Sequence, residues 1–70
     1  MHKEILLAKK ILNDVKRYSP IHKISLIEIS IPLAYNFDRA KLKKIFHTIG
    51  INLRVVKGEK LKIISFEERY

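Results

Sequence analysis

Hydrophobic and polar positions follow two different periods along this chain, and each period predicts a type of element. Between Asn36 and Gly50 the apolar residues recur at i, i+3, i+4 and i+7, the spacing of a helix that lies on a core. Asn36 or Asp38 can cap the start of this helix, and Gly50 suits the left-handed position after its end. We therefore predict a helix over residues 38–49 whose buried side consists of Leu42, Ile45, Phe46 and Ile49.

The other side of the predicted 38–49 helix is basic. No acidic residue follows Asp38 within it. Its polar side and the flanks of that side are formed by Arg39, Ala40, Lys41, Lys43, Lys44 and His47. Such a helix presents one side to the fold and the other to a polyanion.

Residues 3–17 follow the helical period as well. Their broad apolar stripe, continued by Tyr18, is made of Ile5, Ala8, Ile11, Leu12 and Val15. Ser19-Pro20 ends this helix, because the residue before a proline is driven out of the α region. Two interpretations of the stripe stay open: a core helix of one small domain, or a dimer interface.

Residues 21–35 give conflicting signals. Ile27, Ile29, Ile31 and Leu33 alternate with Glu28, Ser30 and Pro32, which predicts a strand with one buried face. Ser25 and Glu28 have the spacing of a capping box, which predicts a helix that starts at Ser25. Pro32 fits neither assignment, since it would kink a helix interior and is excluded from a central strand. The local pattern leaves helix and strand open.

Residues 51–66 predict a β-hairpin. Gly58 can take the left-handed position of a three-residue loop. That register places Leu53 opposite Leu61 and Ile51 opposite Ile63 on one apolar face. The residues after this hairpin, 67–70, are expected to form a short, frayed polar tail.

The opposite face of the predicted hairpin carries a ladder of basic side chains. Arg54 lies directly across from Lys60, and Lys62 follows on the same face. Like charges opposite each other destabilise a sheet, so an anionic ligand against this face would explain the ladder. The alternative is a solvated outer face, because exposed like charges cost only tenths of a kcal/mol each.

Composition narrows the class of protein. Seventy residues make a single domain, 1–70, near the lower size limit for folding without disulfides or metals. Lysine and arginine number 15 against 7 acids, which gives a formal net charge of +8. In a chain this small, that excess favours nucleic acid as a partner over a neutral protein, although a solvated lysine-rich surface is the alternative.

The sequence also excludes several classes of function. Without cysteine there are no disulfides and no thiolate metal sites, and the three histidines are too scattered for a metal cluster. No apolar run approaches a membrane span, and the start of the chain is unlike a secretory signal, so we expect a cytoplasmic, nucleoid-associated protein. No Gly-rich phosphate loop or acid–base pair indicates catalysis. We expect no enzyme activity, no cofactor and no metal.

If residues 25–34 are helical, the order of elements resembles the winged helix-turn-helix DNA-binding domains, especially the minimal ones of archaea and their viruses. The residues that carry the resemblance are the helix opening Ser25-Leu26-Ile27-Glu28, the turn Ala34-Tyr35-Asn36 and the wing tip Lys57-Gly58-Glu59-Lys60. The resemblance implies an α+β fold with three helices and a C-terminal β-hairpin wing. It also implies that the helix from Asp38 is the recognition helix.

The resemblance further implies a set of DNA-binding residues. Those facing base edges in the major groove would be Asn36, Arg39, Ala40 and Lys43. Those facing phosphate would be Lys41, Lys44 and His47, and those facing the flanking backbone or minor groove Arg54, Lys57, Lys60 and Lys62. The protein would then be a small transcriptional regulator or chromatin-associated factor that prefers double-stranded DNA to RNA.

Two alternatives stay open. If residues 24–31 form a strand, the order becomes α-β-α-β-β, with a three-stranded sheet whose basic face could bind RNA or DNA. As a different function, the domain could bind protein as an accessory module of a nucleic-acid-processing complex such as a polymerase. A homodimer is compatible with any of these.

Overall fold

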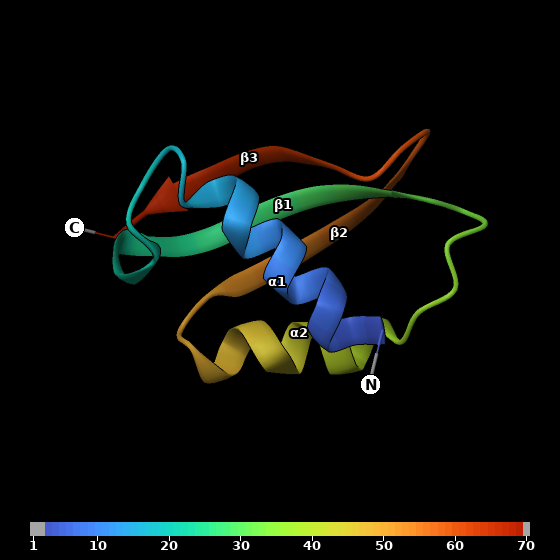
Figure 1. Cartoon of the computed structure of the whole chain (residues 1–70), viewed down its shortest axis with the longest axis horizontal. Helices are drawn as coiled ribbons and strands as arrows, with labels where there is room; N and C mark the ends of the chain where they lie inside the picture. Colours follow the sequence, from blue (N-terminus) through green and yellow to red (C-terminus); the bar gives the residue numbers. More distant parts are fainter. Residues whose placement is uncertain (1–2, 70) are drawn as a thin grey trace.

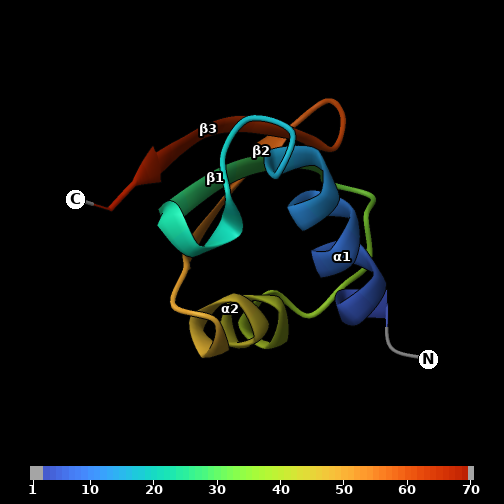
Figure 2. The same cartoon turned by 60° about the vertical axis from the view of Figure 1, so that its left-hand side comes forward.

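Two helices lie on one face of a three-stranded sheet in the computed structural model, which describes residues 3–69 (Figure 1). The elements follow in the order α1 (Lys3–Val15), the 3₁₀ turn η1 (Ile21–Lys23), β1 (Ile24–Pro32), α2 (Arg39–Thr48), β2 (Asn52–Gly58) and β3 (Lys62–Glu68). Seen from the side, both helices lie beneath the sheet, with α2 under β2 and α1 beside it (Figure 2). Within residues 3–69, neither helix is long and apolar enough to cross a membrane.

The winged helix-turn-helix prediction is wrong, and the alternative order α-β-α-β-β fits the structure. The segment that had to be the second helix is the central strand β1. Ser25 caps no helix; it lies at a β-bulge, where its hydroxyl donates a hydrogen bond to the Glu67 carbonyl at 3.2 Å. The alternating isoleucines outweigh the capping box because a strand buries all of them on one face. Pro32 is tolerated because it is the last residue of β1.

The predicted hairpin is wrong too, because β2 and β3 lie on opposite sides of β1. The strand order is β2-β1-β3, with β2 parallel and β3 antiparallel to β1. Ile27 therefore pairs with Leu53 on one side and with Phe66 on the other. Leu53 has no pairing with Leu61, and the predicted tail is partly strand, since β3 continues to Glu68. Tyr70 lies outside the described residues.

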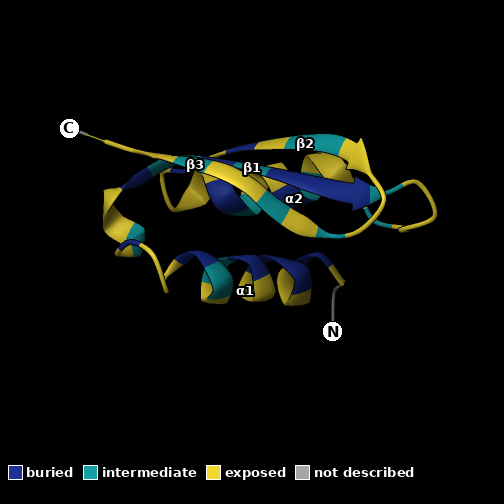
Figure 3. Ribbon diagram, turned by 90° about the horizontal axis from the view of Figure 1, so that it is seen from above, coloured by how far each residue is buried: buried dark blue, intermediate teal, exposed yellow. Residues whose placement is uncertain are grey.

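The core fills the space between the helices and β1. Its buried residues are Leu7, Ala8, Ile11, Val15, Ile24, Ile27, Ile29, Ile31, Leu42, Phe46, Ile51 and Leu53. Viewed from above, β1 is buried along most of its length, whereas β2 and β3 are largely exposed or half-buried (Figure 3). Both predicted helical stripes are confirmed at their centres and fail at their ends, where Tyr18 is 74% and Ile49 46% exposed.

The turn from β2 to β3 crosses over β1 on the face away from the helices, which we call the outer face. Ser30 of β1 lies beneath this crossing and donates its hydroxyl to the Lys60 carbonyl at 2.8 Å. A Cβ on Gly58 would lie 2.7 Å from the Ser30 Cβ, closer than two carbons can approach. Gly58 is thus needed for close packing, and Gly50, at φ 79°, is the glycine that adopts the left-handed conformation.

We predict that Gly58→Ala lowers the free energy of unfolding by about 1–3 kcal/mol, because the added methyl forces the crossing away from β1. Urea denaturation of the purified variant measures this. Replacing Ser30 by Gly removes the opposing Cβ, so the Gly58→Ala cost should shrink by about 0.5 kcal/mol or more in that background. Gly50→Ala is the matched control, since its cost comes from backbone strain and should be unchanged by Ser30→Gly. If Gly58→Ala lowers the free energy of unfolding equally in the wild-type and Ser30→Gly proteins, the contact with Ser30 is not the cause.

Candidate nucleic-acid interface

The basic helix predicted from the sequence is confirmed as α2. Asp38 is its N-cap and accepts a hydrogen bond from the Lys41 backbone N–H at 3.1 Å. Thr48, its last residue, donates its hydroxyl to the Lys44 carbonyl at 2.9 Å, and Gly50 follows in the left-handed conformation. Leu42 and Phe46 are buried and hold the helix on the core. This anchoring leaves its opposite side in solvent.

A shallow groove runs between the exposed side of α2 and the start of β2. Its helical wall consists of Ala40, Lys43, Lys44 and His47, and its other wall of Ile51, Asn52 and Leu53. The four helical residues are spaced i, i+3, i+4 and i+7, so they share one face of α2. Among the described residues that line this groove, none is acidic. We call it the α2–β2 groove.

The α2–β2 groove combines cations with open space. Lys43, Lys44 and His47 are exposed, so their side chains keep their hydration and can reorient towards a ligand. Ala40 contributes no side chain beyond Cβ, which keeps that end of the groove open. Four of the eleven residues predicted to bind DNA thus lie together, and all four come from one helix.

Lys41 lies on a different side of α2 and faces α1. Its ammonium is 3.8 Å from Oε1 of Glu4, and Oε2 of Glu4 accepts a hydrogen bond from the Asp38 backbone N–H at 3.1 Å. Glu4 therefore joins the first turn of α1 to the start of α2. The structure thus gives Lys41 an acidic neighbour within the fold and places it outside the α2–β2 groove.

Asn36 is also separated from the groove. It lies in the loop before α2, where its carbonyl accepts a hydrogen bond from the Lys3 ammonium at 3.1 Å. With Lys3, Leu6 and Tyr35 it lines a hollow between α1 and this loop. Arg39, the first residue of α2, is exposed.

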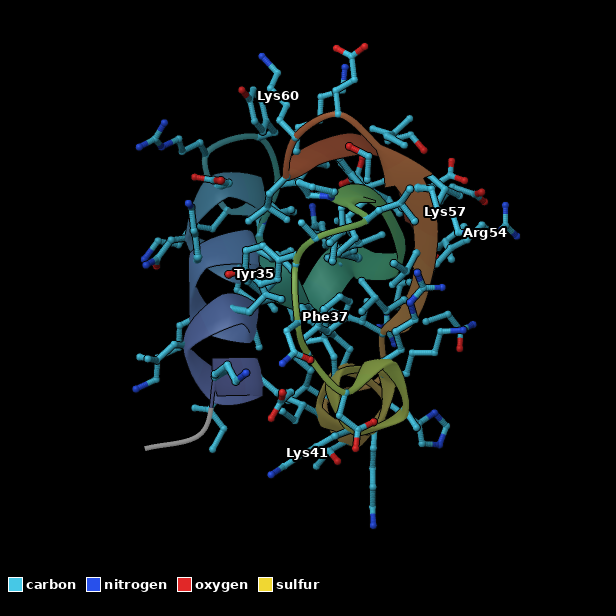
Figure 4. All side chains as sticks on the ribbon, turned by 90° about the vertical axis from the view of Figure 1, so that its right-hand side faces the viewer. Tyr35, Phe37, Lys41, Arg54, Lys57 and Lys60 are labelled. Carbon is cyan, nitrogen blue, oxygen red and sulfur yellow. The ribbon has the colours of Figure 1, made fainter. Side chains whose placement is uncertain are left out.

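The basic ladder predicted for the hairpin does not form. Arg54 of β2 pairs with Glu28 of β1, and Lys62 of β3 pairs with Ser30 of β1, so β1 separates the two cations. Lys60 lies in the turn between β2 and β3. In Figure 4, Arg54 and Lys57 extend from β2 on one side of the molecule, Lys60 lies at the turn, and Lys41 lies far from it on α2. The outer face is therefore mixed in charge.

Sequence reasoning missed three residues that shape this region. Asn52 lines the groove, and its position just before the buried Leu53 could have indicated this. Glu4 and Arg69 gave no local signal, because their partners are remote in sequence. Arg69 donates hydrogen bonds from one guanidinium nitrogen to the Ile24 carbonyl at 2.6 Å and to the Gly50 carbonyl at 2.8 Å, which fixes the loop between α2 and β2.

Comparisons with known proteins do not assign this chain to a family or a function. A scan against protein-family models gave no match, and neither the curated proteins nor the solved structures contain a significant match to this chain. Within residues 3–69, no cluster of three or more histidine or acidic side chains could hold a metal ion.

We predict that Glu4→Gln makes the protein less stable at neutral pH and less sensitive to acid. The Asp38 backbone N–H, and secondarily the Lys41 ammonium, hold the pKa of Glu4 below its ordinary value, although burial opposes them. A carboxylate with a lowered pKa stabilises the fold above the unfolded-state pKa, about 4.3, and this stability is lost as the pH falls through the folded-state pKa.

Thermal unfolding followed from neutral pH down into the acid range tests this. The wild type should lose more stability on acidification than Glu4→Gln, and the two curves should converge at low pH. Glu59→Gln, in the exposed turn after β2, is the matched control and should follow the wild type. Parallel curves for wild type and Glu4→Gln would refute the role of this carboxylate.

Proposed function

We propose that this protein is a non-enzymatic, double-stranded DNA-binding protein of the chromatin-associated kind, and that it binds the phosphate backbone along the α2–β2 groove. The observation that carries the proposal is the grouping of Lys43, Lys44 and His47 on one exposed helical face, with no acid among the described lining residues. Cations grouped in this way create a positive field that attracts phosphates and releases their counterions.

The distribution of acids supports the choice of this groove over other basic surfaces. Several cations outside this groove have an acid nearby: Lys41, on another side of α2, lies 3.8 Å from Glu4, and Arg54 has Glu28 as its partner in the strand register. Glu59 precedes Lys60 in the β2–β3 turn. The cations of the α2–β2 groove, by contrast, have no acid among the described residues that line it.

A duplex fits this groove better than a single strand. Proteins that hold single strands usually add aromatic rings on which bases stack. The lining residues carry no phenyl or phenol ring. Tyr35 and Phe37 lie instead in the loop before α2 and contact each other edge-to-face, with ring centroids 5.9 Å apart.

DNA is favoured over RNA because the cations lie on a surface helix. The major groove of B-DNA is wide enough to admit a helix, whereas that of A-form RNA is deep and narrow. Lysine provides a point charge without the bidentate geometry that arginine uses to read guanine. Binding through Lys43 and Lys44 should therefore depend on charge more than on sequence, which suits a chromatin-associated role better than a sequence-specific regulator.

The experiment is a salt titration of labelled duplex DNA by fluorescence anisotropy. Two lysine–phosphate contacts in the groove give a slope of about −1.8 in log K against log salt. The double variant Lys43→Gln/Lys44→Gln removes both contacts, so the slope should become less steep by about 1.8. Duplex RNA and single-stranded DNA of the same sequence should bind more weakly.

The matched control is Lys9→Gln/Lys16→Gln, which removes the same charge from exposed positions of α1 and the turn after it. Its slope should stay near that of the wild type. If both double variants change the slope equally, binding follows net charge alone, and the assignment to the α2–β2 groove is wrong.

A further inference from the structure

The two edge strands of the sheet differ in the charges that they carry, and the proposed binding in the α2–β2 groove does not account for this difference. β2 forms one edge, and its charged side chains, Arg54 and Lys57, are both cations. β3 forms the other edge, and its charged residues have opposite signs at opposite ends, with Lys62 at the start and Glu67 and Glu68 at the end. Edge strands left open in this way pair readily with another strand.

The direction of each β3 side chain follows from its pairing with β1. Ile63 pairs with Ile29 and Phe66 pairs with Ile27, so both face the helices. Lys62 pairs with Ser30, and Glu67 pairs with Leu26, so both face outward. Ile64 is the extra residue at a β-bulge, where the register shifts between the partners of Glu28 and Ile29, and it is 47% exposed.

We propose that two copies of this chain form a dimer by antiparallel pairing of β3 with β3. A two-fold axis at Ser65, with Ile64 as the extra residue of the bulge, places Lys62 opposite the partner copy's Glu67, both on the outer face. It also places Ile63 opposite the partner copy's Phe66, both on the helical face. The axis repeats each pair, so the interface contains two opposite-charge pairs and two apolar pairs.

The alternation of β3 side chains between the two faces of the sheet favours this register over a one-residue slip. A slip of one residue would place outward-facing Lys62 opposite Glu68, whose carboxylate lies on the helical side and accepts a hydrogen bond from the Ser19 hydroxyl at 2.6 Å. It would also place inward-facing Ile63 opposite outward-facing Glu67. Because side chains alternate with a period of two, a one-residue slip is excluded, and among the registers that keep both faces consistent this one sets Lys62 opposite Glu67.

Exposed apolar side chains beside β3 would be buried by the second copy in this dimer. A groove between the end of α1 and β3 has an apolar floor of Tyr18, Leu61, Ile63, Ile64 and Phe66, with Asp14, Arg17, Lys62 and Ser65 completing its lining. Tyr18 is 74% exposed, although its ring lies against Phe66 with centroids 6.4 Å apart. Pairing across the dyad brings the partner's Ile63 and Phe66 next to this groove, which extends the apolar layer across the interface.

The proposed dimer would have a continuous six-stranded sheet with all four helices on one face. The strand order β2-β1-β3-β3-β1-β2 leaves the cationic β2 strands as the two outer edges. Five strand spacings separate these edges by about 24 Å. A β2–β2 contact would offer no opposite-charge pair, because Arg54 and Lys57 are the only charged residues of β2 and both are cations.

Charge reversal tests the proposal in the absence of any nucleic acid. Sedimentation equilibrium of the wild type at about 100 μM should show a dimer, since even a weak edge contact is populated there. Lys62→Glu alone and Glu67→Lys alone should each weaken the dimer at least about tenfold, because each turns two attractions into two repulsions. The double variant Lys62→Glu/Glu67→Lys restores opposite charges and should dimerise like the wild type.

Mixing the two single variants gives the sharpest outcome. In a one-to-one mixture, the carboxylate introduced by Lys62→Glu in one chain faces the ammonium introduced by Glu67→Lys in the other. The native Glu67 of the first chain faces the native Lys62 of the second, so a heterodimer should form from two monomeric samples. Glu59→Lys, in the turn beyond the pairing, is the control and should dimerise normally.

Circular dichroism verifies that every one of these variants is folded. A monomeric wild type, or a dimer that survives both single reversals unchanged, would overturn the proposal.

Discussion

The burial of β1 is the constraint on which the rest of the structure depends. Ile24, Ile27 and Ile29 have no exposed surface, and Ile31 has almost none. One face of β1 can be covered by helices, but both of its edges also need strand partners, and a hairpin formed by residues 51–66 would have supplied only one. Separating β2 from β3 satisfies both edges. The parallel β1–β2 pairing requires a crossover, and α2 is that crossover, which fixes its place beside β2.

The sequence predicts what is local and fails where remote segments compete. The caps of α2 and the stripes of both helices were predictable, because their signals lie within one or two turns. The assignment of residues 24–32 was undecided locally, since Ser25-to-Glu28 obeys a helical rule and the isoleucines a strand rule. The prediction that Gly58 takes the left-handed position of a hairpin loop is wrong: Gly58 instead allows β1 to approach at Ser30, a contact between segments remote in sequence.

The candidate site, like the fold, was predicted from the sequence only where its signals are local. Net charge and the basic side of α2 were evident from the sequence, and Ala40, Lys43, Lys44 and His47 do share a groove. Which cations are compensated could not be predicted, because each acid acts across the fold. Glu4 lies 3.8 Å from Lys41, 37 positions along by sequence number, and Glu28 becomes the neighbour of Arg54 only through the parallel strand register. Such contacts exist only once the topology is known, so a charge pattern alone overestimates the binding surface.

The different roles proposed for the two sheet edges follow from the same topology. The charged residues of β2 are both cations, and β2 forms one wall of the α2–β2 groove. β3 carries opposite charges at its ends and lies on the far side of β1 from that groove. A duplex along α2 and a second copy on β3 would therefore not compete for surface. The proposed dimer would also present two α2 helices on the same face, so that one duplex could contact both and gain avidity without a new contact.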